Sequence, residues 1–225
     1  IVAKGKIEVS DKDGKNQTVE AKHIIIATGA RSRELPTMKI DGKKIIGYRE
    51  AMVLPEIPKS MVIVGSGAIG VEFAYFYNSM GTKVTIVEFL PRIVPVEDED
   101  ISKELEKSYK KNGITIMTSS EVTAVDTSGN GVKASVKSAT GETVLEADVL
   151  LSAVGVTANI EGIGLETLGI KIDKGRVMVD KYGQTNVPGI YSIGDCSPGQ
   201  ALAHVASKEG IVCVEAIAYN ENKYH

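Results

Sequence analysis

The sequence predicts an α/β protein with a largely parallel sheet, and two observations support this prediction. Between residues 60 and 88, a short apolar run, a glycine-rich turn, a helical stretch and a second apolar run follow one another. The pattern of residues 19–30 also returns in residues 145–156, at a constant offset of 126 positions. Apolar runs separated by a helical stretch are typical of parallel strands joined by a helix. A pattern that repeats at a fixed offset indicates two related domains.

The glycine-rich turn has a spacing that predicts a function. The run Met61–Val64 leads into Gly65-Ser66-Gly67-Ala68-Ile69-Gly70, which has the form GxGxxG. In this pattern the first glycine permits a tight turn, the second lets the backbone approach a pyrophosphate, and the third lets helix and strand pack closely. The phosphates are expected at the amino end of the helix that begins near Ala68, where free N–H groups favour negative charge.

Glycine-rich turns also arise for packing reasons alone, but here the whole surrounding unit is in register. The second apolar run, Val84–Val87, ends in Glu88, which lies 18 residues after Gly70. A carboxylate at the end of the second strand accepts hydrogen bonds from the adenine ribose of a dinucleotide and repels a 2′-phosphate. We therefore predict a Rossmann-like domain that binds NAD in preference to NADP.

Composition excludes several classes of protein. The chain has 225 residues, enough for one large or two modest domains, and its net charge of -3 offers no basic surface for nucleic acid. No run of about 18 apolar residues predicts a membrane span, and we expect a soluble, cytoplasmic protein. Cys196 and Cys213 have neither metal nor redox spacing, so two free buried thiols are expected rather than a functional pair. The three histidines form no zinc pattern.

The start of the chain predicts a hairpin over residues 1–20, with its turn at residues 13–16. Because the chain begins in strand-like sequence without a methionine, we expect it to be a fragment. The echoed segment 145–156 closes the domain that the turn at Gly65 opens. Segment 19–30 is therefore expected to close a related domain whose own glycine turn lies before Ile1. Residues 33–58, which contain three prolines, are expected to connect the two domains.

The rest of the chain predicts further strands and two helices. Residues 98–112 have apolar side chains at helical spacing, acids at the start, lysines at the end and a stop at Gly113, as an amphipathic helix does. We expect a remnant of the first domain and the connector in residues 1–57, the dinucleotide domain in 58–178, and a closing segment of the first domain in 179–225. The other expected elements are a parallel strand at 114–117, meander strands at 122–125, 132–136 and 143–145, a return to the parallel sheet at 148–154, strands at 176–179 and 190–193, and a helix at 202–220.

Four motifs in order resemble those of the flavoprotein disulfide reductases that have two dinucleotide-binding domains. They are Ile25-Ile26-Ala27-Thr28-Gly29, the turn with its flanks at 64–72, Leu151-Ser152-Ala153-Val154-Gly155, and the stretch 185–195 that ends in Gly194-Asp195. Residues 88–98, with 202–204 and 209–210, look most like dihydrolipoamide dehydrogenase. The resemblance implies a Rossmann-like NAD-binding domain, with a parallel sheet plus an antiparallel β-meander, beside remnants of a related FAD-binding domain.

The resemblance implies an NAD site in the second domain. The turn is implied to hold the pyrophosphate, Glu88 the adenine ribose, Val122 the adenine face, and Gly155 the nicotinamide half. Glu72 is implied to lie near the nicotinamide at the flavin, and a solvated glutamate stabilised by the helix dipole is the alternative. The implied NAD residues are Gly65, Ser66, Gly67, Ala68, Ile69, Gly70, Glu72, Glu88, Val122 and Gly155.

The resemblance also implies part of an FAD site, formed by Thr28, Gly29, Asp195 and Ala203. Asp195 is implied to accept a hydrogen bond from a ribityl hydroxyl, whereas a cap of the next helical segment is the alternative. Ala203 is implied to approach the flavin through its backbone.

The implied reaction of the parent protein passes electrons from dihydrolipoamide, through a disulfide and FAD, to NAD. The implied partners are the lipoyl-proteins of 2-oxoacid dehydrogenase complexes and a second copy in a homodimer. The family's FAD glycine turn, Cys-x4-Cys pair and His-Pro pair have no match here, so we expect no catalytic residue and no lipoamide turnover in this chain. Gly155-Val156-Thr157-Ala158-Asn159 also departs from the family's Gly-Arg-x-Pro-Asn, which removes an arginine contact.

Two alternatives stay open from the sequence. Because the region that decides the electron acceptor has no match, another member of the class is the first alternative: an NADH oxidase, a coenzyme A disulfide reductase or a mercuric reductase. A nucleotide-binding module without redox activity is the second.

Overall fold

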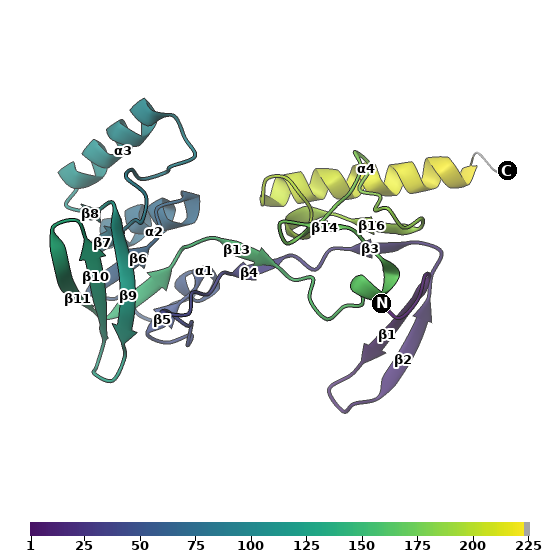
Figure 1. The fold of residues 1–225 in the computed structure, drawn as a ribbon, viewed down its shortest axis with the longest axis horizontal. Coiled ribbons are helices and arrows are strands. Elements are labelled where there is room, and N and C mark those ends of the chain that lie inside the picture. Colours follow the sequence, from purple (N-terminus) through teal and green to yellow (C-terminus); the bar gives the residue numbers. More distant parts are fainter. Residues whose placement is uncertain (223–225) are drawn as a thin grey trace. The chain divides into compact units, whose positions relative to one another are not determined.

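The structure is a computed structural model that covers residues 1–222, with side chains described to residue 219. The chain forms two compact units, which we describe separately (Figure 1). Unit 1 contains residues 1–31 and the chain from 157 onward, and unit 2 contains residues 32–156. None of the helices in this part of the chain is long and apolar enough to cross a membrane.

Unit 2 is built on a five-stranded parallel sheet. Its strands lie in the order β5 (Ile45–Ile46), β12 (Val149–Ser152), β6 (Ser60–Val64), β7 (Lys83–Val87) and β8 (Thr115–Met117). Alternate residues of β6 face opposite layers: Met61 and Ile63 belong to the helical core, and Val62 belongs to the core beneath the meander. Burial on both faces explains why these strands are unbroken apolar runs in the sequence.

Three helices cover one face of this sheet and an antiparallel meander covers the other (Figure 1). The helix predicted over 98–112 is confirmed as α3, whose N-cap Asp98 accepts a hydrogen bond from the Asp100 amide at 2.9 Å. The predicted meander is also confirmed, with strands longer than expected because the hairpin pairing continues into the turns. These elements are α1 (Tyr48–Ala51), α2 (Ala68–Ser79), α3 (Glu99–Lys111), β9 (Ser120–Asp126), β10 (Val132–Ser138) and β11 (Gly141–Ala147).

Unit 1 has a smaller sheet, in which β3 (Ile24–Ile26) and β16 (Ile190–Ser192) pair in parallel. Its buried core includes Leu165, Val177 and Cys196 together with both of these strands. The predicted hairpin over 1–20 is confirmed, although its first strand begins only at Lys6. The other elements are β1 (Lys6–Ser10), β2 (Asn16–Glu20), η1 (Glu166–Leu168), β14 (Ile172–Asp173), β15 (Arg176–Val177), η2 (Gly194–Cys196) and α4 (Ala203–Asn222).

The echo in the sequence corresponds to a repeat in the structure. At the offset of 126 positions, β1, β2 and β3 align with β10, β11 and β12, and β4 (Ala30–Ser32) aligns with β13 (Val156–Ala158). Each copy is therefore a hairpin, a strand of a parallel sheet and a short strand in which the chain passes to the other unit.

The compact units divide the chain at 31/32 and 156/157, whereas the sequence suggested divisions at 57/58 and 178/179. The difference has a physical cause on each side. The connector supplies β5 to the unit 2 sheet through pairing with β12. Residues after 157 supply Leu165, Ile170 and Val177 to the core of unit 1.

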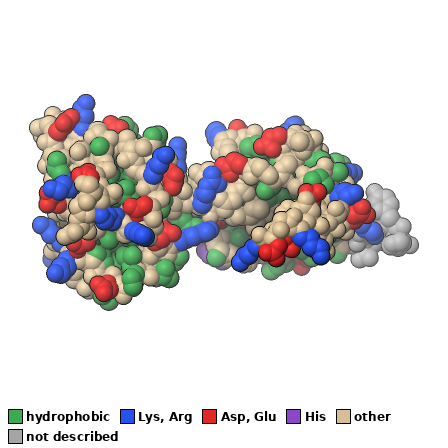
Figure 2. Space-filling model, turned by 90° about the horizontal axis from the view of Figure 1, so that it is seen from below, with side chains coloured by type: hydrophobic (Ala, Val, Ile, Leu, Met, Phe, Trp, Pro, Cys, Tyr) green, Lys and Arg blue, Asp and Glu red, His purple; other side chains and the backbone are tan. Residues whose placement is uncertain are grey.

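Charged side chains are spread over both units. On the face shown in Figure 2, Lys and Arg side chains lie interspersed with Asp and Glu, without a large area of one sign. This distribution agrees with the small net charge of -3.

Candidate dinucleotide-binding site

The glycine turn joins β6 to α2 at the carboxyl edge of the unit 2 sheet. Gly65 has a φ of +97°, and a Cβ there would lie 2.5 Å from the Ala153 carbonyl oxygen. A Cβ on Gly70 would lie 2.1 Å from the Gly65 carbonyl oxygen. These two positions accept only glycine, because any side chain collides with backbone.

Gly67 has a different task in the same turn. It is the N-cap of α2, and open space surrounds the place where its Cβ would be. The first N–H groups of a helix have no acceptor within the helix. The exposed backbone around Gly67 and Ala68 is therefore open to an anion, and Ile69 and Gly70 complete the first turn of α2.

Glu88 follows β7 directly and lies against the glycine turn. Its side chain is buried, with 6% exposed. Its Oε2 accepts hydrogen bonds from the Ser66 amide at 2.8 Å and from the Ser66 hydroxyl at 2.6 Å. Its Oε1 accepts from the Leu90 amide at 2.8 Å. The structure thus brings the acid and the turn together, as their spacing in the sequence predicts.

Val122 and Gly155 lie near the same edge of unit 2. Val122 is buried in β9, whose first residue, Ser120, donates its amide to the Glu88 carbonyl at 2.9 Å. Gly155 follows β12 with a φ of +104°, and its carbonyl accepts from the Arg33 amide at 2.9 Å. Val122 therefore lies in a strand that contacts the Glu88 backbone, and Gly155 follows a strand that pairs with β6.

Glu72 lies on α2, one turn after the first residue of the helix, Ala68, and its side chain is exposed. Burial raises the pKa of the Tyr109 hydroxyl, and the nearby Glu72 charge raises it further. That hydroxyl donates to the Val71 carbonyl at 2.8 Å. Glu72 therefore places a negative charge close to the start of α2 while remaining accessible to solvent.

The residues implied for FAD lie in unit 1, after the ends of its two parallel strands. Thr28 and Gly29 follow β3, and Asp195 follows β16. The Gly29 carbonyl accepts from the Asn159 amide at 2.9 Å, and the Thr28 carbonyl accepts from Asn159 Nδ2 at 3.0 Å. Because parallel neighbours end at the same edge, the topology brings these residues to one side of the small sheet.

Asp195 lies inside η2, and the next helix, α4, begins eight residues later at Ala203. The Asp195 carbonyl accepts from Arg176 Nη1 at 2.7 Å. Helix α4 is tied to η2, because Glu209 Oε2 accepts from the Gly194 amide at 2.7 Å. Ala203 is the first residue of this helix, and its side chain is exposed.

Comparisons with known proteins identify the family. The model described as "Pyridine nucleotide-disulphide oxidoreductase" matches residues 1–210. The chain belongs to this family. A dihydrolipoyl dehydrogenase from Rhizobium etli is 52% identical over 202 residues, which are 89% of this chain and 42% of that protein. A leghemoglobin reductase from Glycine max is 43% identical over 218 residues, 96% of this chain and 42% of that protein.

A solved structure of this family has the same fold. The crystal structure of LpdA from Mycobacterium tuberculosis matches with a TM-score of 0.84 and 32% identity, over 94% of this chain and 46% of that one. This match confirms the predicted α/β fold. The chain spans less than half the length of these family members.

Neither cysteine of the chain has the surroundings of a reactive thiol. Cys196 and Cys213 are both free and buried, as predicted. Burial raises the pKa of the Cys213 thiol, and the charge of Asp180 raises it further. Within residues 1–222, no group of three or more His, Cys, Asp or Glu side chains could hold a metal ion.

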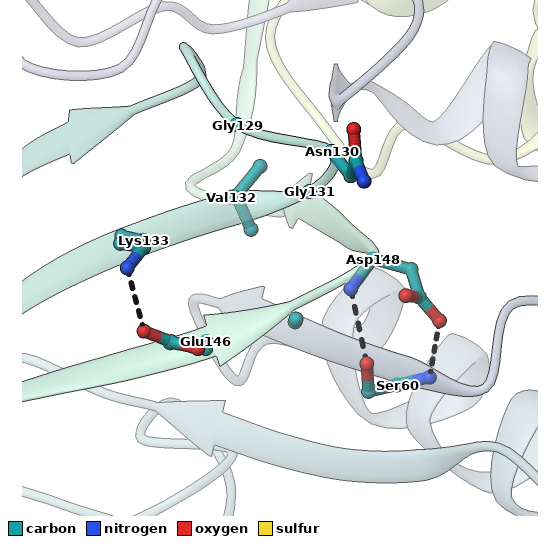
Figure 3. A pocket seen from close by; sticks show the side chains of 9 residues that line it. Ser60, Gly129, Asn130, Gly131, Val132, Lys133, Glu146 and Asp148 are labelled. Atoms are coloured by element: carbon teal, nitrogen blue, oxygen red, sulfur yellow. Dashed lines mark hydrogen bonds and ion pairs between the residues drawn. The ribbon is translucent and has the colours of Figure 1, made fainter.

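The cavity in Figure 3 lies away from the candidate site. It has a volume of about 380 Å³ and is found at the amino ends of β6 and β12, whereas ligands of such sheets bind at the carboxyl ends. Its polar groups bond with one another: the Ser60 amide donates to Asp148 Oδ2, and the Asp148 amide to Ser60 Oγ, both at 3.0 Å. Lys133 and Glu146 form an ion pair at 2.8 Å. These groups are satisfied without a ligand.

Two features of the site were missed in the sequence. The first is the bond between the Ser66 hydroxyl and Glu88, since the pattern GxGxxG leaves this position unspecified. The second is Val94, which has a φ of +39° and donates its amide to the Ser66 carbonyl at 2.9 Å. A β-branched residue in this region costs on the order of 1–3 kcal/mol. Pro91 and Pro95 disfavour a regular helix in this segment, but they give no sign of which residue is strained.

Proposed function

We propose that unit 2 binds NAD(H) at the glycine turn. The observation that carries this proposal is the fixed Glu88 carboxylate beside the open amino end of α2. The backbone from Gly65 to Gly70 suits a pyrophosphate, and Glu88 suits a ribose hydroxyl. A 2′-phosphate would meet the Glu88 charge, so NADH is favoured over NADPH. In the same proposal Val122 contacts the adenine, while Glu72 and Gly155 lie near the nicotinamide half.

We further propose that unit 1 contributes Thr28, Gly29, Asp195 and Ala203 to an FAD site. The positions of these residues after β3, after β16 and at the start of α4 support it. The Asp195 carboxylate makes no hydrogen bond within the described residues, which leaves it available to a ribityl hydroxyl. A bound flavin supplies electron transfer to the nicotinamide. The role of these residues is to bind and orient it.

For the parent protein we propose the activity of a dihydrolipoamide dehydrogenase. The 52% identity to the Rhizobium etli protein supports this choice. In this proposal the parent is a cytoplasmic homodimer that oxidises the lipoyl-proteins of 2-oxoacid dehydrogenase complexes. This chain alone is proposed to have no lipoamide turnover, because both of its cysteines are buried and unpaired. A mixture of the chain, FAD, dihydrolipoamide and NAD should form no NADH, and enzymatic formation of NADH would contradict this proposal.

A second candidate is a family member with another electron acceptor. The leghemoglobin reductase is 43% identical and supports this alternative. A lipoamide assay of the parent protein separates the two candidates, since only a dihydrolipoamide dehydrogenase should reduce NAD with that dithiol. A nucleotide-binding module without redox activity would bind NADH and pass no electrons in any of these assays.

The NAD site is tested by titrating the chain with NADH and with NADPH and following nicotinamide fluorescence. We expect tighter binding of NADH, and a loss of about tenfold or more in Glu88→Ala, because a hydrogen bond to a charged group is lost. Glu146→Ala is the matched control, since it removes an exposed carboxylate of the meander that lies beside the amino ends of β6 and β12, away from the glycine turn. Equal affinity for the two nucleotides, or an unchanged affinity in Glu88→Ala, would contradict the proposal.

A further inference from the structure

The hydrogen bonds to Glu88 occupy most of the acceptor sites of its carboxylate. A carboxylate has about four lone-pair sites, two on each oxygen. The amide and the hydroxyl of Ser66 occupy both sites of Oε2. The Leu90 amide occupies one site of Oε1. Within the described residues, a single acceptor site is left on Oε1.

Ser66 is held in place from three sides, so this arrangement is rigid. Its side chain is fully buried. Its amide and hydroxyl both donate to Glu88, and its carbonyl accepts from the Val94 amide at 2.9 Å. A hydroxyl bonded at 2.6 Å to a carboxylate is a strong, charge-assisted donor. The carboxylate is therefore unable to rotate without breaking several short bonds.

We propose that Ser66 determines specificity at this site: by filling Oε2, its hydroxyl limits Glu88 to one ribose hydroxyl, accepted through Oε1. This inference rests on the proposed NAD site and adds a residue to it. The second hydroxyl of the ribose diol is not bound by Glu88. Because the pinned carboxylate cannot turn away, it also opposes a 2′-phosphate more strongly than a mobile acid would.

The variant Ser66→Ala separates the role of the Ser66 hydroxyl from that of the Ser66 amide. It keeps the amide donor and removes the hydroxyl, so Oε2 gains a free acceptor site and the carboxylate gains freedom to rotate. Glu88 then accepts both hydroxyls of the diol. The preference for NADH over NADPH should fall at the same time, because the acid is able to move away from a 2′-phosphate.

The test uses the 225-residue chain and two analogues of NADH, which lack the 2′ or the 3′ hydroxyl of the adenosine ribose. In the wild type we expect one analogue to bind about tenfold weaker than NADH and the other within about twofold. In Ser66→Ala we expect both analogues to lose affinity relative to NADH. Ser66→Thr retains a hydroxyl and should restore the single-hydroxyl pattern. Thr82→Val is the matched control, since it removes a buried hydroxyl at the amino end of β7 and should keep the wild-type pattern.

The pattern across analogues is not altered by a general loss of stability, and thermal unfolding of each variant checks that it folds. Equal losses for both analogues in the wild type would overturn the inference, even if Ser66→Ala failed to fold. An unchanged single-hydroxyl pattern in Ser66→Ala would overturn it as well. These results leave the NAD site standing if Glu88→Ala still weakens NADH. Absence of NADH binding to the wild type would overturn the proposed site and this inference with it.

Discussion

The two units contain the same repeated segment but complete it differently. In unit 2, β12 lies between β5 and β6, inside a sheet of five strands. In unit 1, the corresponding β3 pairs with β16, and no other strand of the described chain joins its sheet. The repeat by itself therefore supplies a hairpin and one parallel strand. The dinucleotide geometry of unit 2 comes from what is added to it: β6, the glycine turn, α2 and the acid after β7.

The difference extends to the cores. Unit 2 buries apolar side chains on both faces of its sheet, in two clusters. Within the described residues, unit 1 has a single smaller cluster, and apolar residues remain at its surface. Ile211 and Val214 of α4 are 52% and 54% exposed, and Ile25 of β3 is 36% exposed. A sheet with fewer strands buries less apolar surface, so unit 1 should be the less stable part.

We expect the largest difference in the free energy of unfolding when one glycine of each unit is replaced by alanine. In Gly70→Ala the new Cβ meets the Gly65 carbonyl, so we expect a loss of about 3 kcal/mol in the free energy of unfolding. Gly29→Ala has open space and a φ of +69°, so only the left-handed backbone costs energy, about 1 kcal/mol. Denaturant unfolding of both variants measures the difference, and equal losses would contradict the steric account.

Gly67→Ala is the control within the turn. Its Cβ meets nothing within 4 Å, so the chain should stay folded. The added methyl group occupies the space proposed for the pyrophosphate, and NADH affinity should fall. Loss of the fold in this variant would show that the three glycines do not have separate tasks.

Hydrogen exchange should show the next largest difference. Amides of β6 and β12 are expected to open only with global unfolding, whereas amides of β3 should exchange through local opening. We expect the opening free energies to differ by about 2 kcal/mol, or about thirtyfold in exchange. Mass spectrometry of the unliganded chain measures this, and equal protection in the two units would contradict the comparison.

We expect a smaller effect on stability at a position where the two copies of the repeat carry different side chains. Ser152 of β12 corresponds to Ile26 of β3, and its buried hydroxyl has no hydrogen-bond partner in the structure. Ser152→Ala removes an unsatisfied polar group, so we expect a gain of about 1 kcal/mol in the free energy of unfolding. Thr82→Val, which breaks a satisfied bond to the Pro58 carbonyl at 2.7 Å, should destabilise instead. A loss of stability in Ser152→Ala would mean that its hydroxyl has a partner.

The smallest effect concerns an exposed ion pair of unit 1. Arg31 holds the pKa of Glu161 at about 2, below the ordinary value of 4.5. A lowered pKa in the folded state stabilises the fold above pH 4.5, and this contribution is lost as the pH falls toward 2. Glu161→Gln should therefore reduce the dependence of stability on pH in this window. Salt should shrink the difference, because both side chains are exposed. Identical dependence of stability on pH in the wild type and the variant would contradict this role of the ion pair.

Much of unit 2 was predictable from the sequence, because each signal is local. Apolar runs gave the strands, GxGxxG gave the turn, and the acids and lysines of 98–112 gave α3. The unit boundaries were not predictable, because they depend on long-range pairing such as β5 with β12. The same holds for α4: periodicity identifies an apolar face but not whether anything covers it.

Within the candidate site, residue spacing predicted that Glu88 lies beside the turn. The bond from the Ser66 hydroxyl was not predictable, because it depends on the side-chain directions of two segments 22 residues apart. The positive φ of Val94 was not predictable either. Its amide donates a hydrogen bond to the Ser66 carbonyl, and no local sequence pattern encodes that contact.

The central claim is that the nucleotide binds to unit 2 through its glycine turn and not to the repeat in unit 1. Hydrogen exchange with and without NADH tests this claim most directly, because it locates the ligand on the chain. We expect new protection at the amides of residues 65–70 and 88–90, and none at 28–29 or 194–195. Protection at residues 28–29 and 194–195 without protection at 65–70 would contradict the account.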